Sequence, residues 1–262
     1  MNIEFFTFLK REIHRFLVLY KQTIVPALIS SLLYIIVFGN ALGARMGPID
    51  NRTYIQYIIP GLAMMSVINQ AYQNSASSIM QGKYLKFIED ILVSPLSGLQ
   101  ISLGYIIGGA LRGLICGFGI LIICLFLTDF QIDNYILTFL YLLTVSWTFS
   151  AFGVIIGIYA KSWDEIGSFT NFIFMPLTFL GGVFYSVDML PTMEILGREI
   201  PIWKNISYLN PIYWMITGLR YATLSVGGKA VMVTSLFICF GFSGIFTIIA
   251  AWMFKTGYKI KS

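Results

Sequence analysis

Arg112 is a charged residue inside one of the longest apolar runs of the sequence, which extends from residue 100 to residue 127. If a helix begins near Ile101, eleven residues at about 1.5 Å each place Arg112 roughly 16 Å inside an apolar layer. No Asp or Glu lies at a comparable depth in the other apolar runs. We therefore expect its partners to be Asn69, Gln70 or Gln73, backbone carbonyls, water or an anionic ligand. The residues alone leave two interpretations open, an internal hydrogen-bond network and a binding position for a substrate.

A second group of charges lies in the polar stretch between two apolar runs, at residues 82–97. Its charged residues and its proline are Lys83, Lys86, Glu89, Asp90 and Pro95. Apolar residues are interleaved with these charges and a proline ends a helix, so the stretch predicts a helix of two to three turns that is polar on one side. A simple connector needs only about four residues. We interpret the stretch as a rigid docking element for a cytoplasmic partner, with a solvated amphipathic connector as the alternative.

The sequence contains no recognisable machinery for catalysis or energy conversion. The phosphate-binding pattern G-x-x-x-x-G-K-[ST] is absent, and the nearest string, GGKA at 227–230, lacks both the spacing and the hydroxyl. The patterns G-x-S-x-G and H-E-x-x-H are also absent, and His14 is the only histidine. We therefore expect no catalytic residue, cofactor or metal site in this chain. Because interior acids for a proton relay are also missing, the energy for any transport must come from another chain.

These residues belong to a chain whose composition requires lipid as its solvent. Of its 262 residues, 57% are hydrophobic and 11% charged, and the mean hydropathy is +0.80, whereas soluble domains are about 25% charged. Crossing about 30 Å of hydrocarbon takes roughly 20 apolar residues. Six runs reach this length and predict an all-α, polytopic membrane protein with a single domain over residues 1–262. The predicted spans are 22–42, 54–76, 100–127, 134–159, 167–187 and 231–254.

The Lys and Arg residues at the edges of the spans predict the orientation. With the N-terminus inside, ten of them fall on the inner side, Lys255, Lys259 and Lys261 included, and six fall on the outer side. This bias favours cytoplasmic N- and C-termini. A net charge of +5 that is spread along span edges does not form the basic patch of a nucleic-acid binder, so we expect no nucleic-acid partner.

Two segments outside the spans carry further predictions. Residues 3–20 place apolar side chains on one helical face and Arg11, His14 and Arg15 on the other, which predicts an amphipathic helix in the membrane interface. Beyond anchoring the chain, such a helix could sense lipid or guide a substrate. Residues 188–230 are apolar enough to suggest a seventh span, but that crossing would place the C-terminal lysines outside. We expect short re-entrant or interfacial helices on the outer face instead.

Glycines around Arg112 form two G-x-x-x-G steps, 109–113 and 113–117. Such steps permit close helix approach, and we expect packing within the chain, with a dimer seam as the alternative. In the fifth predicted span, Pro176 and the pair Gly181-Gly182 predict a kink or an early helix end.

Six segments together resemble permeases of the ABC-2 family, in the branch that contains nodulation-factor and daunorubicin-type exporters. The resemblance covers nearly the whole length of the chain and is specific to the family, not to a substrate. The segments are REIHRF at 11–16, FGNALGARMG at 38–47, PGLAMMSV at 60–67, IEDILVSPLS at 88–97, PLTFLGGVFYS at 176–186 and LNPIYWMITGLRY at 209–221.

The resemblance implies six spans with cytoplasmic termini in a bacterial inner membrane, an N-terminal interfacial helix and short outer helices before the last span. It also implies a homodimer of permeases with two separate ATPase subunits, which bind the ATP and Mg²⁺. In such complexes the loop after the second span contacts the ATPase, and this role carries over to the stretch from Lys83 to Pro95, with Glu89 and Asp90 at its centre.

We therefore expect the transmembrane permease of an ATP-driven exporter that moves an amphipathic or lipid-like substrate outward. The alternatives are a channel or secondary transporter without an ATPase, an integral membrane enzyme, and a scaffold that docks partners at the membrane. Missing interior acids argue against proton-coupled transport, and missing catalytic patterns argue against an enzyme. The sequence does not specify whether the substrate is a drug, a lipid, a glycolipid or a polysaccharide.

Overall fold

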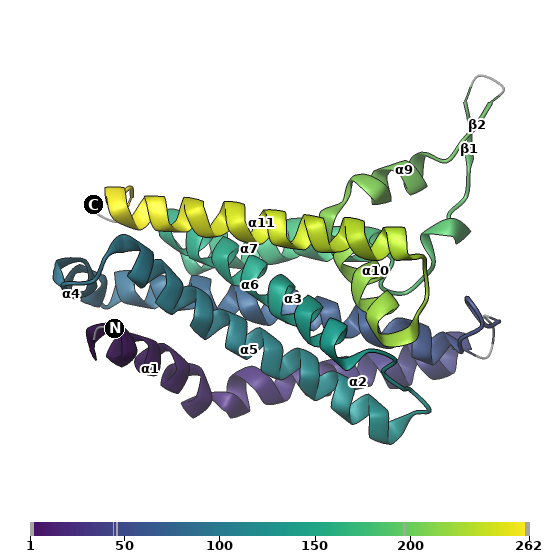
Figure 1. The fold of residues 1–262 in the computed structure, drawn as a ribbon, viewed down its shortest axis with the longest axis horizontal. Helices are drawn as coiled ribbons and strands as arrows, with labels where there is room; N and C mark the ends of the chain where they lie inside the picture. Colours follow the sequence, from purple (N-terminus) through teal and green to yellow (C-terminus); the bar gives the residue numbers. More distant parts are fainter. Residues whose placement is uncertain (1–2, 44, 46, 196–197, 260–262) are drawn as a thin grey trace.

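A computed structural model describes residues 3–43, 45, 47–195 and 198–259 of the chain. The helices form an elongated bundle that has both ends of the chain at one end, the terminal end, and a β-hairpin at the other, the hairpin end (Figure 1). In the described residues, four helices are long and apolar enough to cross a membrane. They are α2 (Tyr20–Gly43), α5 (Gly98–Leu127), α6 (Tyr135–Tyr159) and α11 (Lys229–Thr256). Each begins and ends within two residues of its predicted span.

The central helix is α3 (Tyr54–Tyr84), which packs against α2, α5 and α6. It begins after Thr53, where the Thr53 hydroxyl accepts from Gln56 N and the Gln56 side chain accepts from Thr53 N, a capping box. The helix continues to Tyr84, eight residues beyond the predicted span at 54–76, whose bounds stay a prediction. It can be long and yet less apolar than its neighbours because polar side chains such as Asn74 are buried against other helices.

The fifth predicted span is a succession of short helices, α7 (Trp163–Phe169), a π-helical turn η1 (Thr170–Phe174) and α8 (Met175–Leu180). The predicted bounds of 167–187 were wrong at both ends. The helix begins earlier because the Ser162 hydroxyl accepts from Glu165 N at 3.2 Å. It ends after Leu180 because Gly182 has a φ of +76°, as the glycine pair predicted. The count of six spans stays a prediction, because α3 and this run are not among the four apolar helices.

The segment at 188–230 is built from short elements. They are η2 (Val187–Met189), β1 (Met193–Ile195), β2 (Arg198–Ile200), α9 (Ile202–Leu209) and α10 (Pro211–Leu224). The antiparallel pair β1–β2, which pairs Met193 with Ile200, was not predicted. Asn210 caps α10 by accepting from Ile212 N at 3.0 Å. At 14 residues α10 is about 21 Å long, too short for a seventh crossing.

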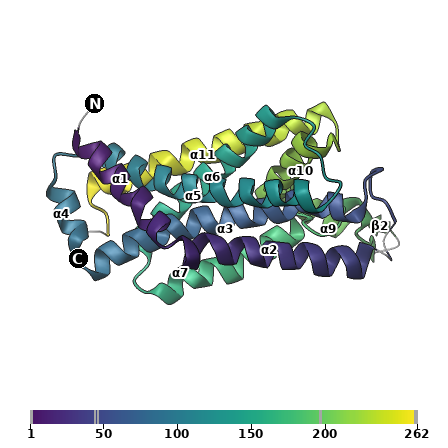
Figure 2. The ribbon, with the colours of Figure 1, turned by 90° about the horizontal axis from the view of Figure 1, so that it is seen from below.

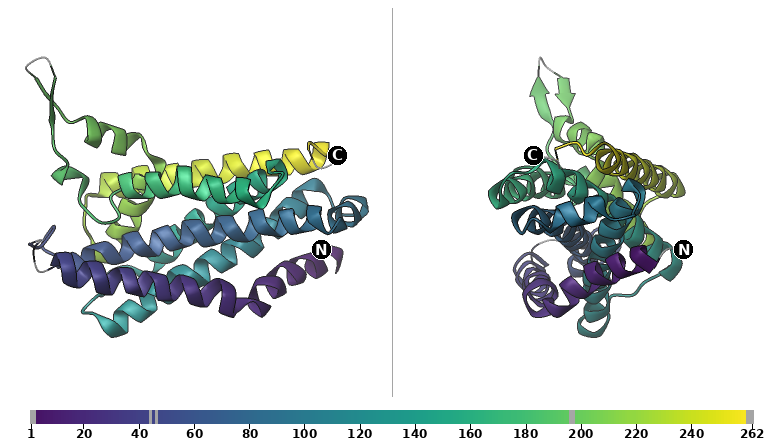
Figure 3. Two further views of the ribbon diagram at one scale, coloured as in Figure 1. Left: turned by 180° about the vertical axis from the view of Figure 1, so that it is seen from behind. Right: turned by 90° about the vertical axis from the view of Figure 1, so that its left-hand side faces the viewer.

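The N-terminal helix α1 (Ile3–Val18) is separate from α2 and meets it at an angle (Figure 3). The predicted helix at 3–20 is therefore present, ending two residues early. Its bundle-facing side is formed by Phe8, Glu12 and Phe16, so an acid lies where an apolar stripe was expected. Its place in the membrane interface and the orientation of the termini stay predictions, and Lys261 lies outside the described residues.

The glycine steps of α5 lie where that helix meets α3 and α6. A Cβ atom at Gly109 would lie 2.2 Å from Ser75 Oγ and 2.3 Å from Ser150 Oγ, and one at Gly113 would lie 2.2 Å from Ser146 Oγ. Any larger residue would force the helices apart. These contacts confirm packing within the chain as the role of this glycine face.

Candidate functional site

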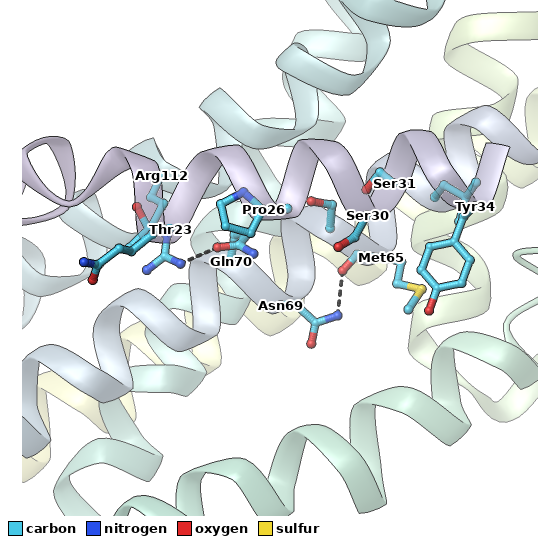
Figure 4. A pocket seen from close by; sticks show the side chains of 13 residues that line it. Thr23, Pro26, Ser30, Ser31, Tyr34, Met65, Asn69, Gln70 and Arg112 are labelled. Carbon is cyan, nitrogen blue, oxygen red and sulfur yellow. Dashed lines mark hydrogen bonds between the residues drawn. The ribbon is translucent and has the colours of Figure 1, made fainter. Parts of the chain in front are cut away.

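A cavity of about 310 Å³ lies between α2 and α3, with Arg112 of α5 at one end (Figure 4). We call it the Arg112 cavity. Among the described residues, none of those that line it is acidic. Its polar lining residues come from three helices and are Gln22, Thr23, Ser30, Ser31, Tyr34, Ser66, Asn69, Gln70 and Arg112.

The polar groups of the cavity are incompletely satisfied. Arg112 is 8% exposed, and its guanidinium donates one hydrogen bond to Gln70 Oε1. Asn69 Nδ2 donates to the Met65 carbonyl of its own helix at 2.9 Å. In the described part of the chain, no protein group bonds to Arg112 Nε, Asn69 Oδ1 or Ser66 Oγ. A buried polar atom without a partner costs about 1–3 kcal/mol, so the cavity combines unused hydrogen-bonding capacity with an unpaired positive charge.

Two of the three amides predicted beside Arg112 are in this cavity, and the third is not. Gln70 bonds to Arg112, and Asn69 lines the same space. Gln73 lies almost one turn further along α3, where its Nε2 donates to Thr170 Oγ1 of η1 at 3.1 Å. Gln73 therefore ties α3 to the run of short helices and is not part of the Arg112 cavity.

A second candidate region is the tip of the bundle at the terminal end. There α3 is followed by α4 (Phe87–Val93), a two-turn helix beside the N-terminal helix (Figures 1 and 2). Lys86, with a φ of +61°, forms the turn between them, and Ile88 and Ile91 are buried. The exposed residues of the predicted docking stretch at 82–97 are Tyr84, Leu85, Lys86, Glu89, Asp90, Val93, Pro95 and Ser97. Three of them, Tyr84, Leu85 and Val93, are large apolar side chains at least 57% exposed beside charges, as on a protein contact surface.

Lys83 differs from the other charges of this stretch because it is half-buried and bound within the chain. Its Nζ donates to the carbonyls of Ile158 and, at 3.1 Å, Ala160, at the end of α6. A cation there satisfies carbonyls that the helix leaves free and complements the helix dipole. Lys83 lies seven residues beyond the predicted span. Burial lowers its pKa to about 8, although the negative charge of Glu165 acts in the opposite direction and raises it. Lys83 thus fastens the docking stretch to the turn between α6 and α7.

The polar residues predicted on α1 have separate places. The Arg11 guanidinium lies 4.2 Å from the centroid of the Phe87 ring of α4, a cation–π contact. Arg15 donates to Asn74 O at 2.8 Å and to Asn74 Oδ1 at 3.0 Å. Burial lowers the pKa of Arg15, and Glu12 opposes this shift. His14 is exposed. Two of the three residues therefore attach α1 to α3 and α4.

Sequence reasoning missed Glu12, which is fully buried between α1 and the bundle. Ser78 Oγ donates to Glu12 Oε2 at 2.6 Å, and Arg15 Nε lies 3.7 Å from the same oxygen. A signal existed, because Glu12 lies four residues from both Phe8 and Phe16 and so shares their helical face. Among the described residues, no ion pair includes Arg112.

The cysteines and the potential metal ligands of the described residues are not arranged as a reactive site. Cys116, Cys124 and Cys239 are free and buried among apolar side chains. No three His, Cys, Asp or Glu residues in the described ranges are grouped so that they could hold a metal ion. The absence of a cofactor from this chain stays a prediction from the sequence.

Known proteins are similar to this chain over most of its length. Residues 3–224 match the family of ABC-2 type transporters. The chain is 39% identical over 252 residues to the inner membrane transport permease YadH of Escherichia coli K12, covering 96% of this chain and 94% of that protein. It is 24% identical over 197 residues to nodulation protein J of Rhizobium leguminosarum bv. viciae, covering 72% of this chain and 74% of that protein. With its long apolar helices, this chain therefore belongs to the ABC-2 type transporter family, as a transmembrane transport subunit.

Proposed function

We propose that this chain is the permease of an ATP-driven exporter in a bacterial inner membrane, with both termini cytoplasmic. Two copies assemble with two ATPase subunits, which bind ATP and Mg²⁺ and hydrolyse the ATP. The permease moves an amphipathic or lipid-like molecule outward. The sequence has no ATP site of its own, and the family membership supports an association with an ABC ATPase.

The observation that carries the proposal is how α4 is held. Its outer side presents Glu89 and Asp90 as free charges at the terminal end, whereas its inner side is buried through Ile88 and Ile91. A helix with one exposed side and one side packed against the bundle can be displaced by a partner and can transmit that displacement to the helices it contacts. A solvated connector would need no such attachment.

The attachments of α4 specify where the motion goes. Through Phe87 it contacts Arg11 of α1, and α1 is held to α3 by Arg15. Through Lys83, just before α4, the stretch holds the end of α6. When the ATPases close on ATP, displacement of α4 therefore moves α1 and the α6–α7 turn together. Helix α1 leads directly into α2, which lines the Arg112 cavity. The α6–α7 turn directly follows α6, which belongs to the core.

The test compares charge reversals at opposite ends of the bundle. The permease is co-expressed with candidate P-loop ATPases from the same genome, purified and reconstituted into liposomes. Glu89→Lys is expected to leave membrane insertion intact and to lower permease-dependent ATP hydrolysis at least tenfold. The matched control is Asp129→Lys, which reverses an exposed acid between α5 and α6, far from the terminal end, and is expected to keep wild-type hydrolysis.

Two results would contradict the proposal. Normal ATP hydrolysis in Glu89→Lys would show that the ATPase docks elsewhere. Failure of any P-loop ATPase to co-purify with the permease would favour a channel, a secondary transporter or a scaffold.

A further inference from the structure

The Arg112 cavity contains a buried positive charge that the protein does not neutralise. An arginine stays protonated under all ordinary conditions, and a buried charge is stable only when it is paired and hydrogen-bonded. Arg112 has one neutral amide partner, Gln70, and its Nε has none among the described residues. The group that a guanidinium with unused donors binds best is an anion with several acceptor oxygens.

The other polar groups of the cavity suit the same ligand. The Ser66 hydroxyl is buried without a partner and can donate to an oxyanion. Ser31 lines the facing side on α2. No described residue of the lining is acidic, so no ionised side chain there repels a negative charge. At about 310 Å³ the cavity lies at the lower end of the range for ligand pockets.

The cavity also changes character along its length. Thr23, Gln70 and Arg112 lie at one end, and Tyr34 and Met65 at the other (Figure 4). The polar end is nearer the terminal end of the bundle, since α2 begins there at Tyr20 and continues toward the hairpin end. From Gln22 to Tyr34, twelve helical residues span about 18 Å. The charged head of an amphipath fits the Arg112 end, and its chain would pass Ser30 and Ser31 toward Tyr34 and Met65.

The outer surface of α2 beside the cavity is apolar. Ile29, Leu33 and Val37 are between 52% and 56% exposed on this helix. An apolar helix face of this kind is typical of a surface in contact with lipid. A molecule that reaches the cavity past α2 would therefore arrive from the membrane. This favours an amphipath over a free ion as the source of the anion.

We propose that the Arg112 cavity binds the phosphate, sulfate or carboxylate head of an anionic amphipath. Arg112 recognises the head, Gln70 orients the guanidinium, and Tyr34 and Met65 contact the first part of the apolar chain. That this amphipath is also the transported molecule rests on the proposed transport function. Binding itself is independent of the ATPase.

The experiment measures binding to the purified full-length permease in a neutral maltoside detergent by calorimetry and by thermal stabilisation. Three probes are compared: dodecyl phosphate, dodecyltrimethylammonium and inorganic phosphate. Dodecyl phosphate is expected to bind saturably and to raise the unfolding temperature. The cationic probe is expected not to bind saturably, and inorganic phosphate is expected to bind at least tenfold more weakly than dodecyl phosphate.

Two variants act on the site by different means. Arg112→Met removes the charge and is expected to weaken dodecyl phosphate binding at least tenfold. Ser66→Leu fills the cavity without breaking a protein hydrogen bond, because the Ser66 hydroxyl has none, and is expected to have the same effect with the guanidinium in place. The matched control is Gln73→Leu on the same helix, outside the cavity, which is expected to bind like the wild type.

Each contrary result overturns the proposal. Unchanged dodecyl phosphate binding in both Arg112→Met and Ser66→Leu places the ligand elsewhere. Saturable binding of the cationic probe contradicts charge recognition. Equal affinity for inorganic phosphate identifies an ion site and not an amphipath site.

A transport measurement separates this proposal from the proposed function. If the reconstituted permease–ATPase complex moves dodecyl phosphate with ATP, but Arg112→Met and Ser66→Leu leave both binding and movement unchanged, the exporter stands and the cavity assignment fails. If dodecyl phosphate binds in an Arg112-dependent manner and no ATP-dependent movement occurs, the site stands and the exporter function fails.

Discussion

Arg220 and Arg112 are both buried arginines without an acid in contact, yet their surroundings differ. Arg220 is 3% exposed, and its guanidinium donates to Tyr57 O at 3.3 Å and to Gly182 O at 2.9 Å. The ring of Tyr57 lies 3.8 Å from the Arg220 guanidinium carbon. Arg112, at 8% exposure, has one amide partner. Each arginine lines a cavity, but the lining of the Arg220 cavity includes Asp50 and Asp188, whereas no described residue that lines the Arg112 cavity is acidic.

The difference separates a structural arginine from one that is incomplete. The Arg220 guanidinium is held by two backbone carbonyls and an aromatic face, and it joins α10 to α3 and to the turn after α8. Arg112 joins only α5 to α3, and part of its donor capacity is unused. A third arginine, Arg15, is intermediate, since it pairs with both Asn74 and Glu12. The number of guanidinium donors that have protein partners, and not burial alone, therefore indicates which arginine is available to bind a ligand.

The largest effect is expected from removal of Arg220, the arginine with more partners. Arg220→Met leaves the Tyr57 and Gly182 carbonyls without their charged donor and loses the cation–π contact. Two hydrogen bonds from a charged group and this contact predict a loss of about 3 kcal/mol in the free energy of unfolding. Thermal unfolding in neutral detergent measures the change. Arg220→Lys keeps the charge but not the planar fork, and is expected to recover less than half of the loss.

If Arg220→Met were as stable as the wild type, the hydrogen bonds of Arg220 would not stabilise the fold, and Arg220 could not be called a structural arginine. Interior arginines would then be tolerated without contributing to the fold, and the incomplete bonding of Arg112 would carry no information.

A smaller effect is expected from the acid that accompanies the intermediate arginine. Glu12→Ala removes the acceptor of the Ser78 hydroxyl and the counter-charge of Arg15, while Asn74 still holds Arg15. We expect a loss of about 2 kcal/mol, measured in the same way. Glu4→Ala, at an exposed position of the same helix, is the control and is expected to change stability by less than about 0.5 kcal/mol. Equal behaviour of the two variants would show that the buried acid contributes nothing to the attachment of α1.

The helices themselves were largely predictable, because long apolar runs with polar flanks define their own ends. This is why α2, α5, α6 and α11 lie within two residues of the prediction. The run from α7 to α8 was misplaced because its first turn contains Asp164 and Glu165. Acidic residues favour a helix start, but they do not count toward an apolar span. A search for apolar runs therefore begins such a helix too late.

The site was predictable in its residue types but not in its arrangement. Asn69, Gln70 and Gln73 lie on neighbouring turns of one helix, and only the packing of α2 and η1 decides which of them faces Arg112. Lys83 and Glu12 illustrate the same limit. Each belongs to a polar pattern in the sequence, and each finds its partner more than 60 residues away, in α6 and α3. Partners at that separation depend on tertiary packing.

The sharpest test makes Arg112 resemble a paired arginine. Gln70→Glu replaces the amide that already bonds to the Arg112 guanidinium by a carboxylate of nearly the same shape. The carboxylate occupies the place proposed for the ligand's oxyanion and neutralises the charge. We expect dodecyl phosphate binding to weaken at least tenfold, measured by calorimetry. Stability is expected to rise by about 1 kcal/mol or less, because the gain of a charge-assisted bond is offset by burial of a second charge.

Gln73→Glu is the matched control, since it adds the same charge almost one turn away, beside Thr170 and outside the cavity. It is expected to leave dodecyl phosphate binding unchanged. If Gln70→Glu also bound the probe like the wild type, Arg112 would not be the recognising charge. Its incomplete bonding would then reflect packing alone, and the distinction from Arg220 would be one of degree. If Gln70→Glu loses binding and Gln73→Glu does not, the result would instead identify Arg112 as the residue that binds the anionic head.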